Sequence, residues 1–340
     1  MSSSSPSRSA ASGRPVRRGL VLGGGGVLGA AWMIGALAAL EDVHGIDPRD
    51  CDVIVGTSAG SVLSALLGAG VSVQQLVSHQ RGHPITEGPL AGYSFDYEKA
   101  TGPSRPTRPK LLGPGSAKLI GSSLRRARRM PPTAVLSGFL PTGTGSLARV
   151  GHLIEAITPM DEWSPHPDMW IVAMDYADGR RVPFGKAGAP VAPLSDAVMA
   201  SCAIPAWFAP VRIDGREYVD GGTWSATNAD LVAGAGLDEV YVLAPMVSFH
   251  LDRPNTLLTR LERRWRLQVT KRCLKEADKV RSHGSNVTVI GPGPEDLEAM
   301  GGNAMDLPRR IKVLETSLRT SMQSLRDPEN LGPDHLSEVG

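Results

Sequence analysis

The stretch that decides the fold is residues 53–63, VIVGTSAGSVL, in which an apolar run leads through a glycine-flanked serine into a helical pattern. The first three residues are β-branched, as in a buried strand, and the apolar residues after the serine have helical spacing. A serine at such a strand-to-helix turn, flanked by Gly56 and Gly60, is typical of a nucleophile elbow. The stretch therefore predicts an α/β fold with Ser58 as a candidate attacking group.

Two further glycine motifs also follow apolar runs. They are residues 24–29, GGGVLG, and residues 220–222, DGG. Because 39 of the 340 residues are glycine, each motif alone could arise by chance and is weak evidence for a site. Their shared position after apolar runs is the stronger evidence. Ligands of open α/β sheets bind beyond the carboxyl ends of the strands. We therefore expect the three motifs, each at the end of a predicted strand, to converge on one site.

Predicted strands and helices alternate along the chain. Strands are expected at residues 20–22, 51–55, 169–174, 240–243 and 287–290, with a hairpin at 211–219. Helices are expected at residues 29–41, 58–67 and 146–157, and a further one covers 311–325. This alternation predicts a mostly parallel central sheet with helices on both faces.

Composition favours an intracellular enzyme-sized domain. With 340 residues and 41% hydrophobic content, the chain is long enough to bury a large core. Its three cysteines are widely spaced and predict neither a disulfide framework nor a metal site. The longest apolar run, residues 27–40, is too short to span a bilayer, and no secretion signal is visible. We therefore expect a cytoplasmic protein without a transmembrane segment.

The predicted domain is flanked by two tails and interrupted by one insertion. Residues 1–17 form a Ser/Arg-rich tail that we expect to be disordered, the alternative being an organelle transit peptide. Residues 18–325 form the α/β domain, with a Pro-rich cap insertion at about residues 81–145. Residues 326–340 are expected to be a disordered C-terminal tail.

The insertion overlaps a strongly basic segment between Glu98 and Glu155. This segment has ten basic residues and no acidic one, although the net charge of the chain is only +2. Its prolines argue against regular structure through much of it, and we interpret it as a mobile cap over the strand-end crevice. The basic residues in 99–149 favour peripheral contact with an anionic membrane surface, and the alternative is a solvated loop without a partner. No nucleic acid is expected as a partner, because no aromatic residue accompanies the arginines between Tyr97 and Phe139 and no recognised binding motif is present.

The glycine loop at residues 24–29 has two interpretations. Consecutive N–H groups at a helix N-terminus can hold the oxyanion that forms when a serine attacks an ester. The spacing Gly24-x-Gly26-x-x-Gly29 also fits a dinucleotide-binding loop, which requires an acidic residue at the end of the second strand. The nearby acidic residues, Asp50 and Asp52, instead lie at the beginning of that strand. The oxyanion interpretation is therefore favoured over dinucleotide binding.

Serine chemistry also requires a base. The histidines after Asp220 are His250, His283 and His335, and only His250 follows a predicted strand as a triad member would. The simpler hypothesis is that Asp220 accepts the proton of Ser58 directly. A carboxylate is a weak base toward a hydroxyl, so such a dyad depends on the oxyanion loop and on burial.

Together these residues resemble the patatin-like phospholipase family. The glycine loop, the GTSAG elbow at residues 56–60 and the run from residue 201 to the DGG motif at 220–222 occur in the family's order. The resemblance covers residues 20–243 apart from the basic insertion. It implies a three-layer α/β/α fold, hydrolysis of acyl esters of lipids as by a phospholipase A, and a Ser–Asp dyad without metal or other cofactor.

The resemblance also assigns roles by position. Ser58 is the nucleophile and Asp220 the proton acceptor. The oxyanion loop is Gly24, Gly25, Gly26 and Val27, and the supporting motif residues are Gly29, Gly56, Gly60, Gly221 and Gly222. Leu28 departs from the family, which usually has Arg or Lys there, so a charge beside the loop is missing. The alternative to an enzyme is a lipid- or partner-binding protein that keeps the fold without turnover.

Overall fold

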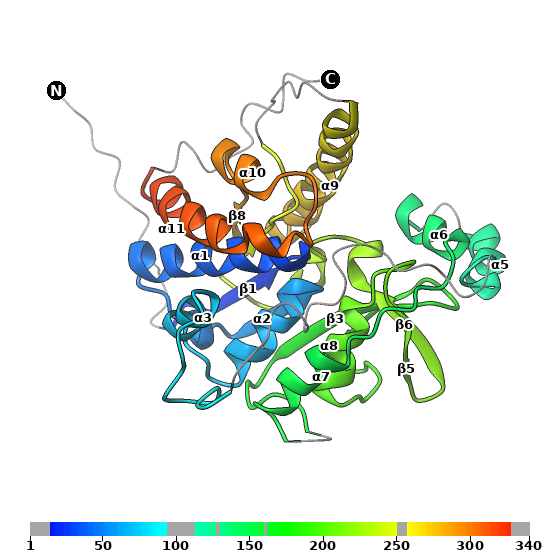
Figure 1. Ribbon diagram of the computed structural model, residues 1–340, viewed down its shortest axis with the longest axis horizontal. Coiled ribbons are helices and arrows are strands. Elements are labelled where there is room, and N and C mark those ends of the chain that lie inside the picture. Colours follow the sequence, from blue (N-terminus) through cyan, green and yellow to red (C-terminus); the bar gives the residue numbers. More distant parts are fainter. Residues whose placement is uncertain (1–13, 94–112, 127–129, 160–161, 250–256, 328–340) are drawn as a thin grey trace.

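Strands from the described part of the chain form one central sheet in the computed structural model (Figure 1). The structure describes residues 14–93, 113–126, 130–159, 162–249 and 257–327. The sheet has the order β5-β6-β3-β2-β1-β7-β8, and β4 pairs with β3 outside this path. The strands are β1 (Arg18–Leu22), β2 (Val53–Thr57), β3 (Met169–Asp175), β4 (Arg181–Phe184), β5 (Val211–Ile213), β6 (Arg216–Asp220), β7 (Glu239–Leu243) and β8 (Asn286–Ile290).

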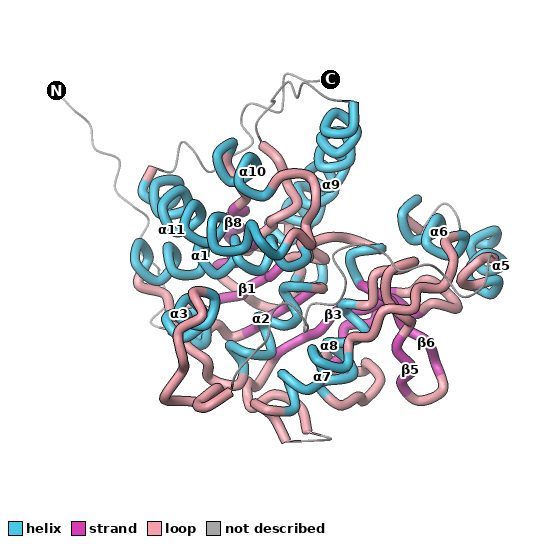
Figure 2. The backbone as a smooth tube through the Cα atoms, in the orientation of Figure 1, coloured by secondary structure: helices cyan, strands magenta, loops and turns pink. Residues whose placement is uncertain are grey.

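The helices cover the sheet on both faces, which gives the three-layer α/β/α fold that the sequence predicts (Figure 2). One layer contains α1, α2, α3, α7, α8 and α11, and α9 packs on the other face. The helices are α1 (Gly26–His44), α2 (Ala59–Gly68), α3 (Val73–Gln80), α5 (Ala117–Arg126), α6 (Pro132–Phe139), α7 (Ala148–Glu155), α8 (Leu194–Cys202), α9 (Leu257–Arg281), α10 (Pro294–Met300) and α11 (Arg310–Arg326).

Alternation along the central strands explains the two layers. In β1, Leu20 and Leu22 face the α1 layer, whereas Val21 faces the α9 layer. All three side chains have no exposed surface. Successive strand residues point to opposite faces, so a strand covered on both sides needs a continuous apolar run. The apolar runs of the sequence therefore correspond to sheet strands buried on both faces.

Strand direction places the three motifs differently from the sequence expectation. β1 and β2 are parallel, with Leu22 opposite Gly56, so the glycine loop and the serine turn leave the same edge of the sheet. β6 is antiparallel to β3, and its last residue, Asp220, pairs with Ala173 inside β3. Asp220 therefore reaches the same region from the opposite direction. The predicted convergence is observed, but the rule for parallel strand ends explains only two of the three motifs.

Two element boundaries beside the candidate site differ from the predicted ones in a way that shapes it. β2 continues to Thr57, two residues beyond the predicted end, because its register with β3 pairs Thr57 with Val172. α1 begins at Gly26 rather than at residue 29, because the positive φ of 61° at Gly26 turns the chain into the helix at once. Both shifts shorten the connections, so the serine turn and the glycine loop are held directly by the sheet.

The described part of the basic insertion contains two short helices, α5 and α6, at one end of the sheet (Figure 1). Leu119 of α5 and Ala134 of α6 pack with Met174 and Tyr176 from the end of β3. Regular structure thus forms between the prolines, and Pro132 itself begins α6, where a missing N–H costs nothing. The bounds of the cap insertion stay a prediction, and most residues of the two tails lie outside the described part of the chain.

α1 is long and apolar enough to cross a membrane by length and composition, the single such helix in the described ranges. Its best window has a mean hydropathy of 1.5, and 61% of that window is buried inside the protein. Such burial is what the core helix of a layered fold requires, because the helix contacts α11, α3 and α2.

Candidate active site

Ser58 stands on a strained turn between β2 and α2. Its φ of 53° and ψ of −123° lie outside the regions that residues with a side chain normally adopt. The Ser58 N–H donates to Ser201 Oγ at 2.8 Å, and Ser201 Oγ donates to the Val172 carbonyl at 2.6 Å. The turn is thus fixed to β3 through Ser201, as a nucleophile elbow requires.

Close approach explains the glycines that flank Ser58. A Cβ on Gly60 would lie 2.0 Å from the carbonyl oxygen of Leu22, and one on Gly56 would lie 2.6 Å from the Gly60 oxygen. Neither position has room for a side chain, because the obstructing atoms belong to the backbone. The GTSAG pattern therefore reflects the packing of α2 against the end of β1.

Asp220 lies at the end of β6, at the turn that begins the short 3-10 helix η2 (Gly221–Thr223). The Gly222 N–H donates to its Oδ1 at 2.6 Å, and the carboxylate is hydrogen-bonded with the Ser58 side chain. Only 4% of Asp220 is exposed, and this burial raises its pKa to about 6 against the opposing effect of those two hydrogen bonds. The structure therefore brings Ser58 and Asp220 together, 162 residues apart in sequence.

The glycine loop lies beside this pair, between β1 and α1. The Gly24 N–H donates to the Ala226 carbonyl at 2.8 Å, so it is not available to a ligand. The N–H groups of Gly25, Gly26 and Val27 have no acceptor among the described residues, because they precede or begin α1. Three of the four predicted oxyanion residues thus retain a donor, and Gly24 instead anchors the loop to the segment after the DGG motif.

Two other residues of this loop serve packing. Gly29 lies against Pro245, 3.2 Å from where its Cβ would be. Leu28, which departs from the family pattern, is 1% exposed and packs in the core. Its N–H donates to the Ala304 carbonyl at 3.0 Å. The side chain at this position therefore stabilises α1 and brings no charge to the site.

An apolar cavity of about 130 Å³ begins at Ser58 and continues between the helices of the α1 layer. Its walls come from α1, α2, α3 and α7, and from the segment after α8. The lining residues are Gly26, Val27, Ala30, Ile34, Ser58, Ala59, Val62, Leu63, Leu66, Leu76, His79, Gln80, Val150, Leu153, Cys202, Ile204, Phe208 and Met305. Among the described residues, those of the predicted insertion 81–145 do not contribute to these walls.

Three residues of the cavity wall were not identified by any sequence motif. Burial, with Arg310 nearby, lowers the pKa of His79 to about 4, so its imidazole is neutral at pH 7. Burial, with Asp220 nearby, raises the pKa of the Cys202 thiol to about 12, so it is no competing nucleophile. Met305 reaches the cavity from the loop before α11, far from every motif in sequence.

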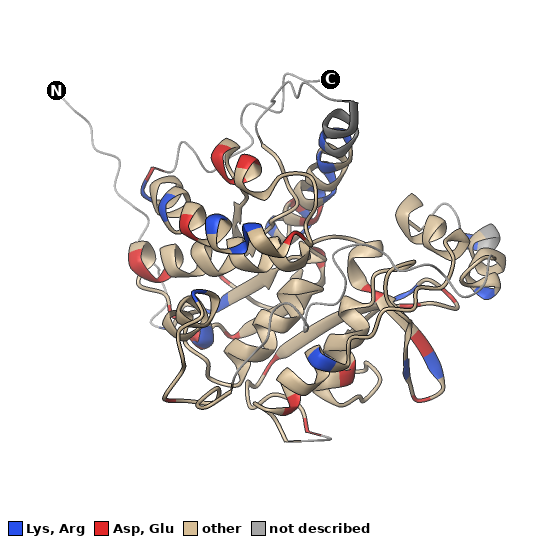
Figure 3. Cartoon of the chain, in the orientation of Figure 1, with Lys and Arg blue, Asp and Glu red and all other residues tan. Residues whose placement is uncertain are grey.

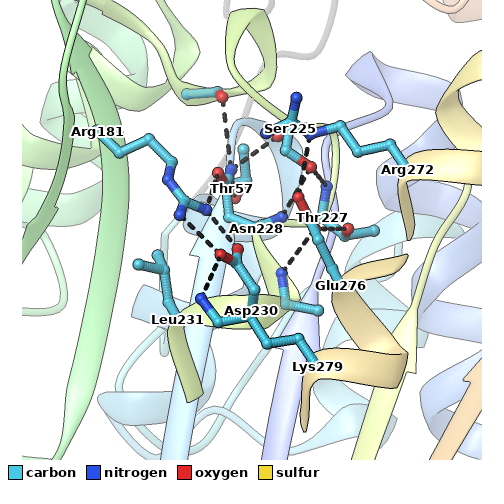
Figure 4. Close-up of polar contacts among 12 residues, drawn as sticks. Thr57, Arg181, Ser225, Thr227, Asn228, Asp230, Leu231, Arg272, Glu276 and Lys279 are labelled. Carbon is cyan, nitrogen blue, oxygen red and sulfur yellow. Dashed lines mark hydrogen bonds and ion pairs between the residues drawn. The ribbon is translucent and has the colours of Figure 1, made fainter. Parts of the chain in front are cut away.

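A buried polar network connects the Ser58 turn with the Asp220 turn (Figure 4). At its centre is Asn228, which has no exposed surface and a left-handed φ of 53°. Its Nδ2 donates to Thr57 Oγ1 at 3.1 Å and to the Gly221 carbonyl at 3.4 Å. Thr57 directly precedes Ser58 and Gly221 directly follows Asp220, so this one amide contacts both neighbours of the pair.

Charged side chains fix the segment that carries Asn228. Arg181 of β4 donates to Asn228 Oδ1 at 3.3 Å and forms a two-pronged ion pair with Asp230, one contact of which is 2.8 Å. Burial alone would raise the pKa of Asp230, but Arg181 and Lys279 outweigh it and hold that pKa below its usual value. Because Arg181 occupies Oδ1, the amide of Asn228 is oriented with Nδ2 toward Thr57.

Glu276 of α9 holds the same segment from the other side (Figure 4). Its Oε2 accepts from Thr227 Oγ1 at 2.7 Å and from the Ala229 N–H at 3.0 Å. Its other oxygen accepts from Arg272 at 3.1 Å. The buried carboxylate is therefore paired, as a charge in this position must be.

The structure bears on dinucleotide binding, one of the alternatives that the sequence left open. β2 ends in Thr57, so no acidic residue stands where a dinucleotide ribose would bind, and Asp52 lies at the opposite end of the strand. His250, the proposed third member of a triad, lies outside the described residues. Within the described ranges, no group of three or more His, Cys, Asp or Glu side chains is arranged to hold a metal ion.

The chain is similar to several known proteins. Among solved structures, the chain is similar to VipD from Legionella pneumophila, with a TM-score of 0.40 and 14% identity, over 92% of this chain and 67% of that one. It is also similar to the type III effector protein ExoU, with a TM-score of 0.36 and 17% identity, over 93% of this chain and 54% of that one. The sequence model described as Patatin-like phospholipase matches residues 20–82 and 99–233, more than half of the chain. The matched residues include the glycine loop, the Ser58 turn and Asp220, and the chain belongs to the patatin-like phospholipase family.

Proposed function

We propose that the protein is a serine acyl hydrolase that cleaves carboxylic ester bonds of lipids, with Ser58 as nucleophile and Asp220 as proton acceptor. One observation carries the proposal. The strained Ser58 turn is hydrogen-bonded with a buried carboxylate at the start of an apolar cavity. Membership of the patatin-like phospholipase family supports the same class of reaction.

The reaction begins with attack of Ser58 Oγ on the ester carbonyl carbon, while the hydroxyl proton passes to Asp220. The carbonyl oxygen becomes an oxyanion, which accepts hydrogen bonds from the N–H groups of Gly25, Gly26 and Val27. The carbon–oxygen bond to the alcohol then breaks, and Asp220 returns the proton to that leaving oxygen. Water, deprotonated by Asp220, hydrolyses the acyl-serine in the same way and releases the fatty acid.

Burial makes Asp220 a better base than an ordinary carboxylate. Its pKa of about 6 lies closer to neutral pH than the usual 3.8, so the carboxylate binds a proton more strongly while the ionised form still dominates at pH 7. The hydrogen bond from the Gly222 N–H to Oδ1 restricts rotation of the Asp220 carboxylate. The carboxylate therefore needs no histidine between itself and Ser58.

The cavity supports a lipid ester as substrate. Apart from Ser58, His79, Gln80 and Cys202, its lining side chains are apolar, and it starts at the nucleophile. A hydrocarbon chain gains free energy by leaving water for such a site, whereas a polar acyl group would lose its hydration. We therefore place the acyl chain in the cavity and the alcohol part of the ester toward solvent.

Labelling with a fluorophosphonate probe tests the proposal, together with hydrolysis of soluble and lipid esters. The intact chain and the His250→Ala variant are expected to label and turn over, whereas Ser58→Ala should not label and Asp220→Asn should lose turnover. Unchanged labelling of Ser58→Ala would overturn the assignment of the nucleophile. Loss of turnover in His250→Ala would favour a triad, and lipid binding without hydrolysis across chain lengths would favour a binding protein on this fold.

A further inference from the structure

Three exposed apolar side chains lie in the second half of α6 and directly after it. Seven large apolar residues are exposed in the described part of the chain, and three of them are Leu136, Phe139 and Leu140. Their exposed fractions are 59%, 54% and 36%. The i, i+3 spacing places Leu136 and Phe139 on the same side of the helix, and Leu140 is the C-cap residue that directly follows it. We call these three residues the α6 face.

The opposite side of α6 is fixed to the protein. Ala134, Ser137 and Gly138 are buried, and the Ser137 carbonyl accepts from the Tyr176 hydroxyl at 2.9 Å. Thr133 Oγ1 donates to the Thr223 carbonyl at 2.6 Å. The three large side chains therefore point outward because the helix is held from behind, and solvation of the apolar face is unfavourable.

The α6 face is connected to the candidate active site at both ends of the helix. Thr223, which accepts the hydrogen bond from Thr133, belongs to η2, directly after Asp220. After α6 the chain reaches Gly145, which pairs with Phe208 of the cavity wall. The α6 face is thus linked through the chain to two segments that carry the candidate site.

The charge around α6 selects the kind of surface. α6 has no charged residue, and α5, which packs beside it, carries Lys118 and Arg126 (Figure 3). In sequence, the whole stretch 99–154 has ten basic residues and no acidic one. Apolar side chains flanked by cations match a bilayer with anionic head groups. The apolar side chains can insert into the acyl region, and the head-group phosphates attract the cations.

We propose that the α6 face docks the protein on an anionic lipid bilayer, with Leu136, Phe139 and Leu140 inserted among the lipids. The inference rests on the proposed function in one respect, because the bilayer then also supplies the substrate. The docking itself requires no turnover. Binding and hydrolysis are therefore separable in experiment.

The test is co-sedimentation of the full chain with vesicles of phosphatidylcholine alone or mixed with phosphatidylglycerol. The parent chain should bind the mixed vesicles more tightly. Leu136→Ser and Phe139→Ser should each weaken binding about tenfold, the amount expected for withdrawal of one large apolar side chain from lipid. Lys118→Glu should weaken binding to the mixed vesicles only.

Val191→Ser is the matched control, because Val191 is 93% exposed and lies outside the α6 face. It should bind vesicles as the parent does. All variants should keep the melting temperature and the hydrolysis of a soluble short-chain ester, since none of these residues lines the cavity. Failure of that hydrolysis in the parent chain would count against the proposed function, not against docking. Absence of vesicle binding by the parent, or equal loss in Val191→Ser and Phe139→Ser, would overturn the docking proposal.

Discussion

Replacement of Asn228 by glycine tests whether the buried network positions the catalytic pair. Glycine keeps the left-handed backbone at φ 53° but removes the amide that donates to Thr57 at 3.1 Å and to Gly221 at 3.4 Å. The bond to the Ser225 carbonyl at 2.7 Å and the contact with Arg181 are lost as well. At about 1 kcal/mol for each of the better hydrogen bonds, we expect about 3 kcal/mol less stability.

The effect on turnover should appear in kcat rather than in KM. Asn228 contacts the neighbours of Ser58 and Asp220 but lines no part of the cavity. Displacement of reacting groups by about 1 Å costs on the order of a hundredfold in rate, so we expect a kcat loss between about tenfold and a hundredfold. The assay is steady-state hydrolysis of a soluble chromogenic ester below the melting temperature of the variant.

Three further variants separate positioning from mere destabilisation. Thr227→Val removes a bond to Glu276 from the same segment, so it should lose stability and keep kcat. Asn228→Asp keeps the shape but presents an oxygen to the Gly221 carbonyl, so it should lose kcat as the glycine variant does. The double variant Thr57→Val with Asn228→Gly should raise the activation barrier for turnover by about 1 kcal/mol less than the sum of the increases in the two single variants. An unchanged kcat in Asn228→Gly, or a kcat loss in Thr227→Val of equal size, would refute the positioning role.

Three other predictions concern the base and the cavity. Turnover of a soluble ester should rise with pH through an apparent pKa of about 6, because burial raises the pKa of Asp220 and the reaction requires its ionised form; a rate independent of pH in this range would contradict it. Asp220→Asn should abolish turnover and raise the melting temperature at pH 8. The folded-state pKa of Asp220 lies above the usual 3.8, so folding stability is lost as pH rises through about 6, and removal of the charge recovers about 3 kcal/mol. Calorimetry should show a smaller gain in stability at pH 5 than at pH 8. An equal gain at both pH values would refute the raised pKa as its cause. Ala30→Leu should narrow the cavity and reduce kcat/KM for long acyl esters while esters of acetate are retained, whereas an equal loss across chain lengths would indicate general misfolding.

Local sequence patterns predicted the central strands β1, β2, β3 and β7 well because these strands are buried on both faces, whereas β4, which is only half-buried, was not predicted. Runs such as the one before Ser58 have no polar residue to disturb the strand, and glycines follow where the chain must turn closely. The direction of β6 was not predictable in this way. A hairpin pattern defines β5 and β6 relative to each other but does not say how the pair joins β3, so the route of Asp220 to the site came only from the structure.

That Ser58 and Asp220 lie together was predictable because a motif marks a backbone constraint at each position. Asn228 was not found, since a single asparagine among turn residues has no spacing signal, although its left-handed φ and its buried amide set it apart in the structure. Met305 was missed for a different reason. It lines the cavity from a loop before α11, and apolar contacts between distant segments leave no local pattern.

The proposed dyad and its surroundings follow from one physical requirement. A carboxylate can take a proton from a serine hydroxyl usefully only if its pKa is raised, and here burial does this for Asp220. The same burial makes the ionised folded state less stable, so the turn needs support that does not lower the pKa again. Bonds to the backbone beside Asp220 meet that need, as from Asn228 to Gly221, because they hold the turn without adding charge at the carboxylate. The cations of the network are instead paired with other carboxylates, Arg181 and Lys279 with Asp230 and Arg272 with Glu276, so their charge is neutralised away from Asp220.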